Sequence, residues 1–369
     1  MSTYKLELVS LAKEYEDGNV IAVDCINLQV QAGETIALLG SSGCGKSTTL
    51  NMIVGLERPS SGDILVDGKS IVGLPAGKRD VGLVFQDYAV FTSMSVRKNL
   101  AFGLEVRGKG RAETDKAVAE VAELLGMSDR LDARAKDLGG SELQRVAIGR
   151  TLVTKPSILL LDEPLSNLET AARMAMRNEL RRLQSEIGLT IIYVTHDQVE
   201  AFSLADRIAV MDAGKILHVE RSAVICHKPD HTFVAGFLGF PPMNLLRGSF
   251  VGNAGTLGFN NGAFTLPVPE TPALPKGICT MGIRPEALHL APEGCAAITG
   301  TVGLLEPRGP ESVLTVSVGP TKLKALVPSD VRLIEGQTVG LNLDYETALF
   351  FDSEKNRSMD FKLNGGQCS

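Results

Sequence analysis

Residues 34–55 read ETIALLGSSGCGKSTTLNMIVG, and the eight residues GSSGCGKS at 40–47 decide the fold. They match the pattern G-x-x-x-x-G-K-S between a short apolar run and a segment with a helical pattern. Glycines let the backbone curl so that successive N–H groups point inward around phosphate oxygens. The stretch therefore predicts a phosphate-binding loop, in which Lys46 reaches the β- and γ-phosphates and the Ser47 hydroxyl ligates Mg²⁺. The residues expected to hold the phosphates are Gly40, Ser41, Ser42, Gly43, Cys44, Gly45, Lys46, Ser47 and Thr48.

A second stretch, SILLLDEP at 157–164, carries two carboxylates at the end of an apolar run. Four apolar residues without alternation indicate a buried strand of a parallel sheet. At such a strand end Asp162 can hold Mg²⁺ through water, and Glu163 projects toward the attacking water. The pair could instead cap the following turn, but the nearby phosphate loop favours the catalytic role. His196 ends another apolar strand, TIIYVTH at 190–196, and is expected to hydrogen-bond the γ-phosphate.

The order of the elements indicates a parallel α/β sheet across residues 34–212. Amphipathic helical patterns cover 112–127 and 169–188. From Phe240 onward glycine and proline are dense and the apolar runs shorten. This change in composition predicts a second, all-β domain built as a small barrel or a pair of barrels, with the boundary near residue 237.

The composition limits the class of protein. A chain of 369 residues is too long for one ordinary core and indicates at least two domains. The net charge of −6 argues against an unaided nucleic-acid binder. The six cysteines have no metal-like spacing and are expected to be free thiols. No apolar run approaches the roughly 18 residues of a membrane span, and no signal peptide is evident, so we expect a cytosolic protein or one that reaches a membrane through a partner.

Further motifs resemble the ATP-binding subunit of ABC transporters, and more closely the importer subunits for sugars, polyols or glycerol-phosphate-type solutes. Phe85-Gln86 resembles the glutamine loop, LSNLE at 165–169 the D-loop, and YVTHDQVEA at 193–201 the switch-histidine segment. Tyr15 lies where the family stacks an aromatic side chain on adenine. The resemblance implies an ATPase that uses ATP and Mg²⁺.

The resemblance also implies roles for particular residues. The expected metal ligands are Ser47, Gln86 and Asp162. The expected catalytic residues are Glu163, His196 and Gln86.

Three C-terminal segments narrow the resemblance to importers. FVAGFLGFPPMN at 233–244, GIRPEAL at 282–288 and VPSDVRLIEGQTVGL at 327–341 are similar to the OB-like (TOBE-type) regulatory domains of carbohydrate importers. The implied architecture is an α/β P-loop NTPase domain of the ABC ATPase type followed by an all-β OB-like domain. The expected bounds are 1–237 for the first, with a helical subdomain at about 88–155, and 238–369 for the second.

The stretch KDLGGSELQRVAIGRTL at 136–152 departs from the family's signature motif, which is usually L-S-G-G-Q before R-Q-R-V-A. In the family this helix points its N-terminus at the γ-phosphate held by a second subunit. Aligned on QRVA at 144–147, the signature residues here are Leu138, Gly139, Gly140, Ser141 and Glu142. Gly139 replaces the usual serine, which removes a hydroxyl donor worth about 1.5–3 kcal/mol. Glu142 replaces glutamine and adds a carboxylate near the triphosphate.

The altered motif leaves three interpretations open. Ser141 restores a donor if the helix starts one residue later. Alternatively, the chain is a weakly hydrolysing or regulatory subunit that still binds ATP. In the third interpretation the change is tolerated, because backbone N–H groups and the helix dipole do most of the holding. Since the other catalytic residues are present, the expected function is ATP hydrolysis that powers solute import.

The resemblance also implies partners. ATP is expected between two head-to-tail ATPase subunits, here a homodimer, bound to two membrane-spanning permeases at the cytoplasmic face of the membrane. An extracytoplasmic solute-binding protein is an indirect partner. The coupling surface is expected in a helical segment at 87–104, where Thr92-Ser93 replace the usual proline-histidine pair. A soluble ABC ATPase without a transporter and a P-loop kinase fit the motifs less well, and sugar, polyol and glycerol-3-phosphate stay open as solutes.

Overall fold

The chain forms two compact units, Met1–Ile225 and Cys226–Ser369. The boundary expected after residue 237 lies inside the second unit, because α8 (Thr232–Phe237) contacts β11 (Asn244–Val251). The computed structural model describes residues 4–15, 18–252, 257–268, 274–292, 294–361 and 363.

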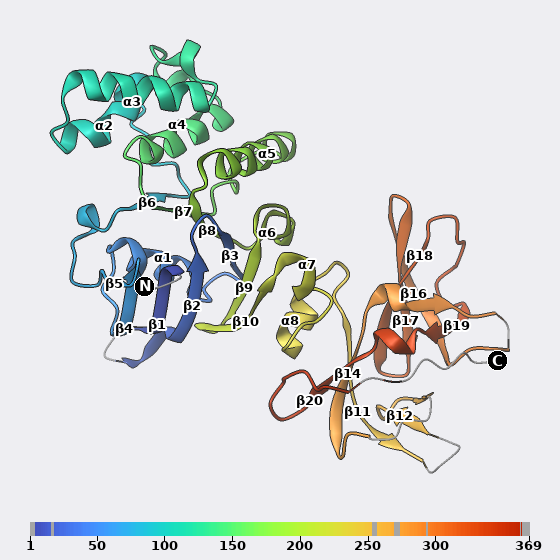
Figure 1. Ribbon diagram of the computed structural model, residues 1–369. Helices are drawn as coiled ribbons and strands as arrows, with labels where there is room; N and C mark the ends of the chain where they lie inside the picture. The colour runs from blue at the N-terminus through green and yellow to red at the C-terminus, as the bar shows by residue number, and fades with distance from the viewer. Residues whose placement is uncertain are drawn as a thin grey trace. The chain divides into compact units, whose positions relative to one another are not determined.

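The centre of the first unit is a six-stranded sheet in the order β10-β9-β3-β8-β7-β6 (Figure 1). Its strands are parallel except β10, which runs antiparallel to β9 along one edge. Every residue of β3 and β8 is buried, as expected for central strands covered on both faces. The strands are β3 (Thr35–Gly40), β6 (Val81–Val84), β7 (Ile158–Asp162), β8 (Thr190–Thr195), β9 (Arg207–Asp212) and β10 (Lys215–Arg221).

A four-stranded antiparallel sheet in the order β2-β1-β4-β5 completes the strands of this unit. Its apolar face shares a core with α1 (Lys46–Val54) and β3, in which Leu6, Leu28 and Leu50 are buried together. This core fixes the helix that follows the glycine loop. The strands are β1 (Tyr4–Tyr15), β2 (Val20–Gln31), β4 (Ser61–Val66) and β5 (Lys69–Ser70).

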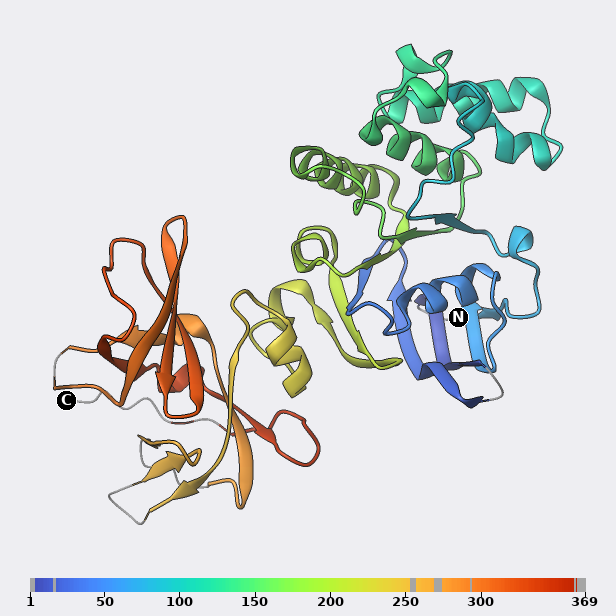
Figure 2. The ribbon, with the colours of Figure 1, turned by 180° about the vertical axis from the view of Figure 1, so that it is seen from behind.

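The chain between β6 and β7 carries α2, α3 and α4, which gather into one group in both views (Figures 1 and 2). Buried side chains of these helices, such as Leu100 and Ile148, join a core with Leu161 and Tyr193 of the sheet. The group is therefore attached to the sheet by packing as well as by chain connections. The helices of this unit after α1 are α2 (Val96–Val106), α3 (Arg111–Leu124), α4 (Gly140–Leu152), α5 (Thr170–Ile187), α6 (Gln198–Leu204) and α7 (Ser222–Ile225), with short 3-10 turns at Ala76–Lys78, Ser128–Arg130 and Ala135–Asp137.

The helix expected over 87–104 starts later than the sequence suggested. Helix α2 begins at Val96, and Ser95 caps it by accepting a hydrogen bond from the Lys98 N–H at 3.3 Å. The Asn99 side chain accepts from the Phe91 N–H at 2.9 Å and donates to the Phe91 carbonyl at 3.0 Å. These side-chain bonds satisfy backbone groups in a non-helical conformation, so the expectation of helix was wrong for 87–95.

The second unit holds two five-stranded antiparallel sheets, in the orders β13-β12-β11-β14-β20 and β15-β19-β16-β17-β18. Both sheets contribute to one apolar core, in which Phe259 and Phe350 are almost fully buried. The strands after β11 are β12 (Gly258–Asn260), β13 (Thr265–Pro267), β14 (Ile278–Ile283), β15 (Leu288–Leu290), β16 (Ile298–Arg308), β17 (Glu311–Val318), β18 (Thr321–Pro328), β19 (Thr338–Leu343) and β20 (Leu349–Asp352), with 3-10 turns at Pro285–Ala287 and Tyr345–Thr347.

Five cysteines are free thiols, and Cys368 lies outside the described residues. In the described part of the chain, every helix is too short or too polar to cross a bilayer.

Arg79 closes the far end of the helix that follows the glycine loop. The residue is 4% exposed, and its guanidinium donates to two carbonyls of the last turn of α1, those of Met52 and Ile53, at 2.6 and 3.0 Å. It also donates to the carbonyls of Leu74 and Val72 at 2.9 and 3.1 Å. The last carbonyls of a helix lack partners within the helix, so one buried side chain satisfies groups that would otherwise be orphaned.

We expect Arg79→Met to lower the free energy of unfolding of the first unit by about 2–4 kcal/mol, because it leaves buried carbonyls without donors. Urea unfolding of the full chain measures this change. The matched control is Arg58→Met at an exposed position, where a change within about 0.5 kcal/mol is expected. Equal midpoints for the two variants would contradict the role given to Arg79.

Candidate functional site

The glycine loop follows β3 and is pressed between two neighbouring backbones. A Cβ on Gly40 would lie 2.2 Å from the Met211 carbonyl oxygen, and one on Gly45 would lie 2.4 Å from that of Ala22. Gly45 also has a φ of 106°, in the left-handed region that favours glycine. The outer glycines of the motif are therefore required by contact with β9 and β2.

Lys46 folds back over the loop. Its ammonium is buried and donates to the carbonyls of Gly40 and Ser41, both at 2.8 Å. The Sγ atom of Cys44 lies 3.7 Å away, and burial raises the pKa of this thiol although Lys46 acts in the opposite direction. The loop thus holds a positive charge at its centre, while the exposed positions of its rim are Ser41, Ser42, Gly43 and Ser47, with Thr48 half-buried.

The structure brings Ser47 and Asp162 together, as the sequence predicted. The Ser47 hydroxyl donates to Asp162 Oδ1 at 3.1 Å, across from the first turn of α1 to the end of β7. Burial raises the pKa of Asp162, and the charge of Glu163 adds to this rise, whereas Ser47 and Lys46 lower it. The Ser47 hydroxyl and the Asp162 carboxylate therefore lie side by side. The raised pKa indicates that a positive charge bound nearby would stabilise the ionised carboxylate.

Glu163 and His196 also meet. Glu163 Oε1 is 3.1 Å from His196 Nδ1, and the two side chains are 18% and 56% exposed. Glu163 has a φ of 44°, which is uncommon for a residue with a side chain. The Glu163 N–H donates to the Val194 carbonyl at 2.9 Å, and the Ser166 hydroxyl donates to the Glu163 carbonyl at 2.9 Å. These bonds hold the Glu163 backbone in this unfavourable conformation and keep its carboxylate at the carboxyl end of β7. Such conformations are common at functional sites.

Gln86 lies two residues beyond the end of β6, the strand that pairs with β7. It is exposed, and its carbonyl accepts a hydrogen bond from the Asn167 side chain at 2.9 Å. Asn167 lies within the D-loop-like segment, but sequence reasoning gave it no role. Its place in that motif is the signal that could have drawn attention to it.

Tyr15 ends β1, where it pairs with Val20 of β2. The ammonium of Lys13 lies 4.7 Å from the centroid of its ring. The same pair of strands carries Ala22, whose carbonyl approaches Gly45. Tyr15 thus belongs to the sheet that borders the glycine loop.

Helix α4 begins at Gly140, and Gly139 is its N-cap residue with φ −75° and ψ 166°. Ser141 is therefore the second helical residue, and the later helix start that one interpretation required for a Ser141 donor is not observed. Glu142 Oε2 accepts a hydrogen bond from the Gly139 N–H at 3.0 Å. Leu138, the remaining residue of the motif, packs against the core beneath the helical group.

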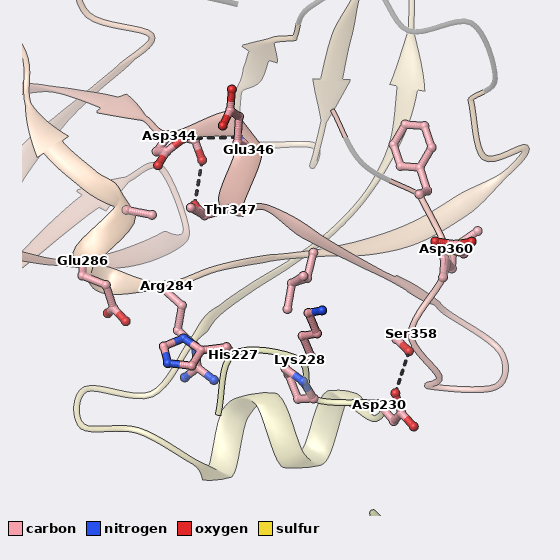
Figure 3. A pocket seen from close by; sticks show the side chains of 15 residues that line it. His227, Lys228, Asp230, Arg284, Glu286, Asp344, Glu346, Thr347, Ser358 and Asp360 are labelled. Atoms are coloured by element: carbon pink, nitrogen blue, oxygen red, sulfur yellow. Dashed lines mark hydrogen bonds between the residues drawn. The ribbon is translucent and has the colours of Figure 1, made fainter. Parts of the chain in front are cut away.

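A cavity of about 840 Å³ lies within the second unit, among residues other than those predicted to bind nucleotide (Figure 3). Arg284 of the GIRPEAL motif lines it and is 8% exposed. Its guanidinium donates to the Leu238 carbonyl at 2.8 Å and to the Cys226 carbonyl. This motif residue therefore ties down the start of the second unit.

A buried lysine in a glycine loop and polar side chains at three neighbouring strand ends define a P-loop ATPase. Models of known families match the chain as ABC transporter over residues 23–166, as MalK OB fold domain over 239–288 and as TOBE domain over 281–351. The chain belongs to the ATP-binding subunits of ABC transporters, which are ATPases.

Several proteins are similar along most of their length. A maltose/maltodextrin import ATP-binding protein of Photorhabdus laumondii is 42% identical over 356 residues, 93% of this chain and 94% of that protein. A trehalose/maltose import ATP-binding protein of Thermococcus litoralis is 40% identical over 93% of this chain and 96% of its own. An sn-glycerol-3-phosphate import ATP-binding protein of Rhizobium etli is 43% identical over 85% and 87%.

A solved structure agrees with the fold. CbiO1 of Clostridium perfringens, described as part of the ABC transporter complex cbiONQ, has a TM-score of 0.56 and 31% sequence identity to this chain. The match covers 61% of this chain and 91% of the other. It confirms the ABC ATPase fold.

The raised pKa of Asp162 predicts a gain in stability for Asp162→Asn. Because its folded pKa is above its unfolded one, the free energy of unfolding falls as the pH rises from the ordinary aspartate pKa through the folded pKa. At pH 7 the neutral amide, which can still accept from Ser47, should therefore raise the melting temperature of the nucleotide-free protein.

Thermal unfolding of the two proteins between pH 3.5 and 7 checks this prediction. The difference should shrink toward the acid end, where the aspartate becomes protonated. The control is Asp115→Asn, an exposed carboxylate on α3, for which no such gain is expected. A loss of stability at pH 7 would show that the carboxylate is not a burden on the free fold.

Proposed function

We propose that the chain hydrolyses ATP at the seam between two copies of itself and so powers import of a sugar, polyol or glycerol-3-phosphate-type solute. The observation that carries this proposal is the pairing of Ser47 with Asp162 beside the pairing of Glu163 with His196. The relatives named for maltose, trehalose and glycerol-3-phosphate import support the solute class.

The residues present fit Mg²⁺. Hydroxyl and carboxylate oxygens are hard donors, and Mg²⁺ bound to nucleotides takes few protein ligands. Ser47 and Asp162 supply two such oxygens 3.1 Å apart, and the exposed amide of Gln86 is the third candidate on the neighbouring strand end. When bound, Mg²⁺ neutralises charge on the phosphate oxygens.

The loop residues bind and orient the triphosphate. Lys46 can exchange its two carbonyl partners for β- and γ-phosphate oxygens without leaving the loop. The N–H groups from Gly40 through Thr48 surround the phosphates at the start of α1, where the helix dipole favours negative charge. Tyr15 stacks on adenine, which contributes about 1–3 kcal/mol for contacts of this kind.

Glu163 and His196 act on the attacking water and the γ-phosphate. The Glu163 carboxylate accepts a proton from the water, which requires that it exchange its hydrogen bond with His196 for one to that water. The freed imidazole N–H then donates to a γ-phosphate oxygen. The exposure of His196 gives it room for this change of partner.

The signature residues Leu138–Glu142 face the ATP of the second copy. Without a hydroxyl at Gly139, the N–H groups of the first turn of α4 and the helix dipole hold the γ-phosphate. The intact set of groups in the first unit supports hydrolysis, and nothing favours the weakly hydrolysing or regulatory alternative.

The ATPase pair sits at the cytoplasmic face of the membrane as a peripheral part of the transporter. Two permeases form the path for the solute, and an extracytoplasmic binding protein delivers it. The segment 87–104 meets the permeases, with Thr92-Ser93 in the irregular part that precedes α2. When the two ATPase copies close around ATP, Gln86 and this segment transmit the movement to the permeases.

The proposed water-activating role predicts the effect of Glu163→Gln. The amide keeps the shape of the side chain but cannot take a proton, so ATPase turnover should fall at least about 100-fold while ATP binding is unchanged. Phosphate release and equilibrium nucleotide binding measure the two quantities.

The matched control is Glu186→Gln, a half-exposed carboxylate near the end of α5, which should keep full turnover. Unchanged turnover in Glu163→Gln would remove the catalytic assignment.

A further inference from the structure

The carboxylate of Glu142 lies between two donors at the start of α4. Its Oε1 atom is 3.1 Å from Arg130 Nε, and its Oε2 atom accepts from the Gly139 N–H at 3.0 Å. Arg130 belongs to the 3-10 turn Ser128–Arg130, so a separate element reaches the helix start. The Glu142 side chain is 22% exposed and that of Arg130 is 52% exposed.

This carboxylate poses an electrostatic problem for the proposed function. A negative charge in the first turn favours the helix itself, because it complements the dipole. The same charge repels a triphosphate that approaches that turn, and the repulsion is strong in a seam from which water is excluded. A glutamine at this place would cap the Gly139 N–H without the charge.

We propose that Arg130 is a positioning residue for ATP bound across the two copies, an inference that rests on the proposed function. Its guanidinium neutralises Glu142 and keeps that carboxylate on the Gly139 N–H. The N–H groups of Gly140 and Ser141 are then left for the partner's γ-phosphate. The Arg130–Glu142 pair is thus equivalent to a single neutral capping side chain.

A double-mutant cycle in the full-length Glu163→Gln protein tests this inference. The variants are Arg130→Ala, Glu142→Gln and the two combined, and light scattering gives the ATP concentration at which half of the protein is dimeric. Arg130→Ala should raise this concentration about threefold to tenfold, the range for one partly screened charge. In the Glu142→Gln background the same change should have an effect below about twofold.

Two further variants sharpen the test. Arg130→Lys keeps the positive charge and should recover most of the loss, whereas Arg111→Ala, which removes a fully exposed arginine of α3, should have no effect. Binding of ATP to the monomer should be the same in every variant, because each monomer's own loop is untouched. A merely structural role for Arg130 would lower the melting temperature and would not depend on the charge at position 142.

The possible failures are distinct. If Arg130→Ala costs the same in both backgrounds, or if Arg130→Lys behaves like Arg130→Ala, the inference is wrong while the proposed dimer stands. If the Glu163→Gln parent binds ATP but stays monomeric at every ATP concentration, the proposed seam is wrong and the inference is overturned with it.

Discussion

Two close backbone contacts fix the loop on which the rest of the site depends. Gly40 and Gly45 stand where any side chain would collide with the carbonyl oxygens of Met211 and Ala22. The loop is therefore set by β9 on one side and by β2 on the other, so the antiparallel sheet helps to shape it. Arg79 holds the opposite end of α1 through carbonyls of its last turn. The helix that follows the glycine loop is thus fastened at both ends.

The carboxyl ends of neighbouring parallel strands bring the chemical groups together. Asp162 and Glu163 follow β7, His196 follows β8, and the loop follows β3, so side chains far apart in the chain meet at one sheet edge. Burial raises the pKa of Asp162, which means that its negative charge lowers the free energy of unfolding of the nucleotide-free protein. A half-buried carboxylate next to a hydroxyl, and a strained glutamate beside a histidine, cost the free fold stability and are common at functional sites.

The sequence predicted the parts of this site that are encoded by local patterns. The glycine spacing gave the loop, and an apolar run ending in Asp162 gave the strand end, because both signals lie within about ten residues. The roles of Arg79 and Arg284 were not predicted, because their partners are distant in the chain. Arg79 donates to the Met52 carbonyl, 27 residues away, and Arg284 donates to the Leu238 carbonyl, 46 residues away. The late start of α2 was missed for a related reason. Its cap, Ser95, and the Asn99 bonds to Phe91 oppose helix in a segment whose composition alone is compatible with it.

The altered signature residues have little effect on the fold of the single chain. An N-cap serine replaced by glycine costs a helix only a few tenths of a kcal/mol, so α4 forms in the expected register with Gly139 as its cap. Glu142 even improves the isolated helix, since it binds the Gly139 N–H and complements the dipole. Both substitutions are therefore nearly neutral or favourable for the single chain, and their cost falls on the phosphate that the helix start would face. In the proposed dimer that phosphate belongs to another copy, so the compensation has to come from a group that changes the charge at the helix start, and Arg130 is the group placed to do so.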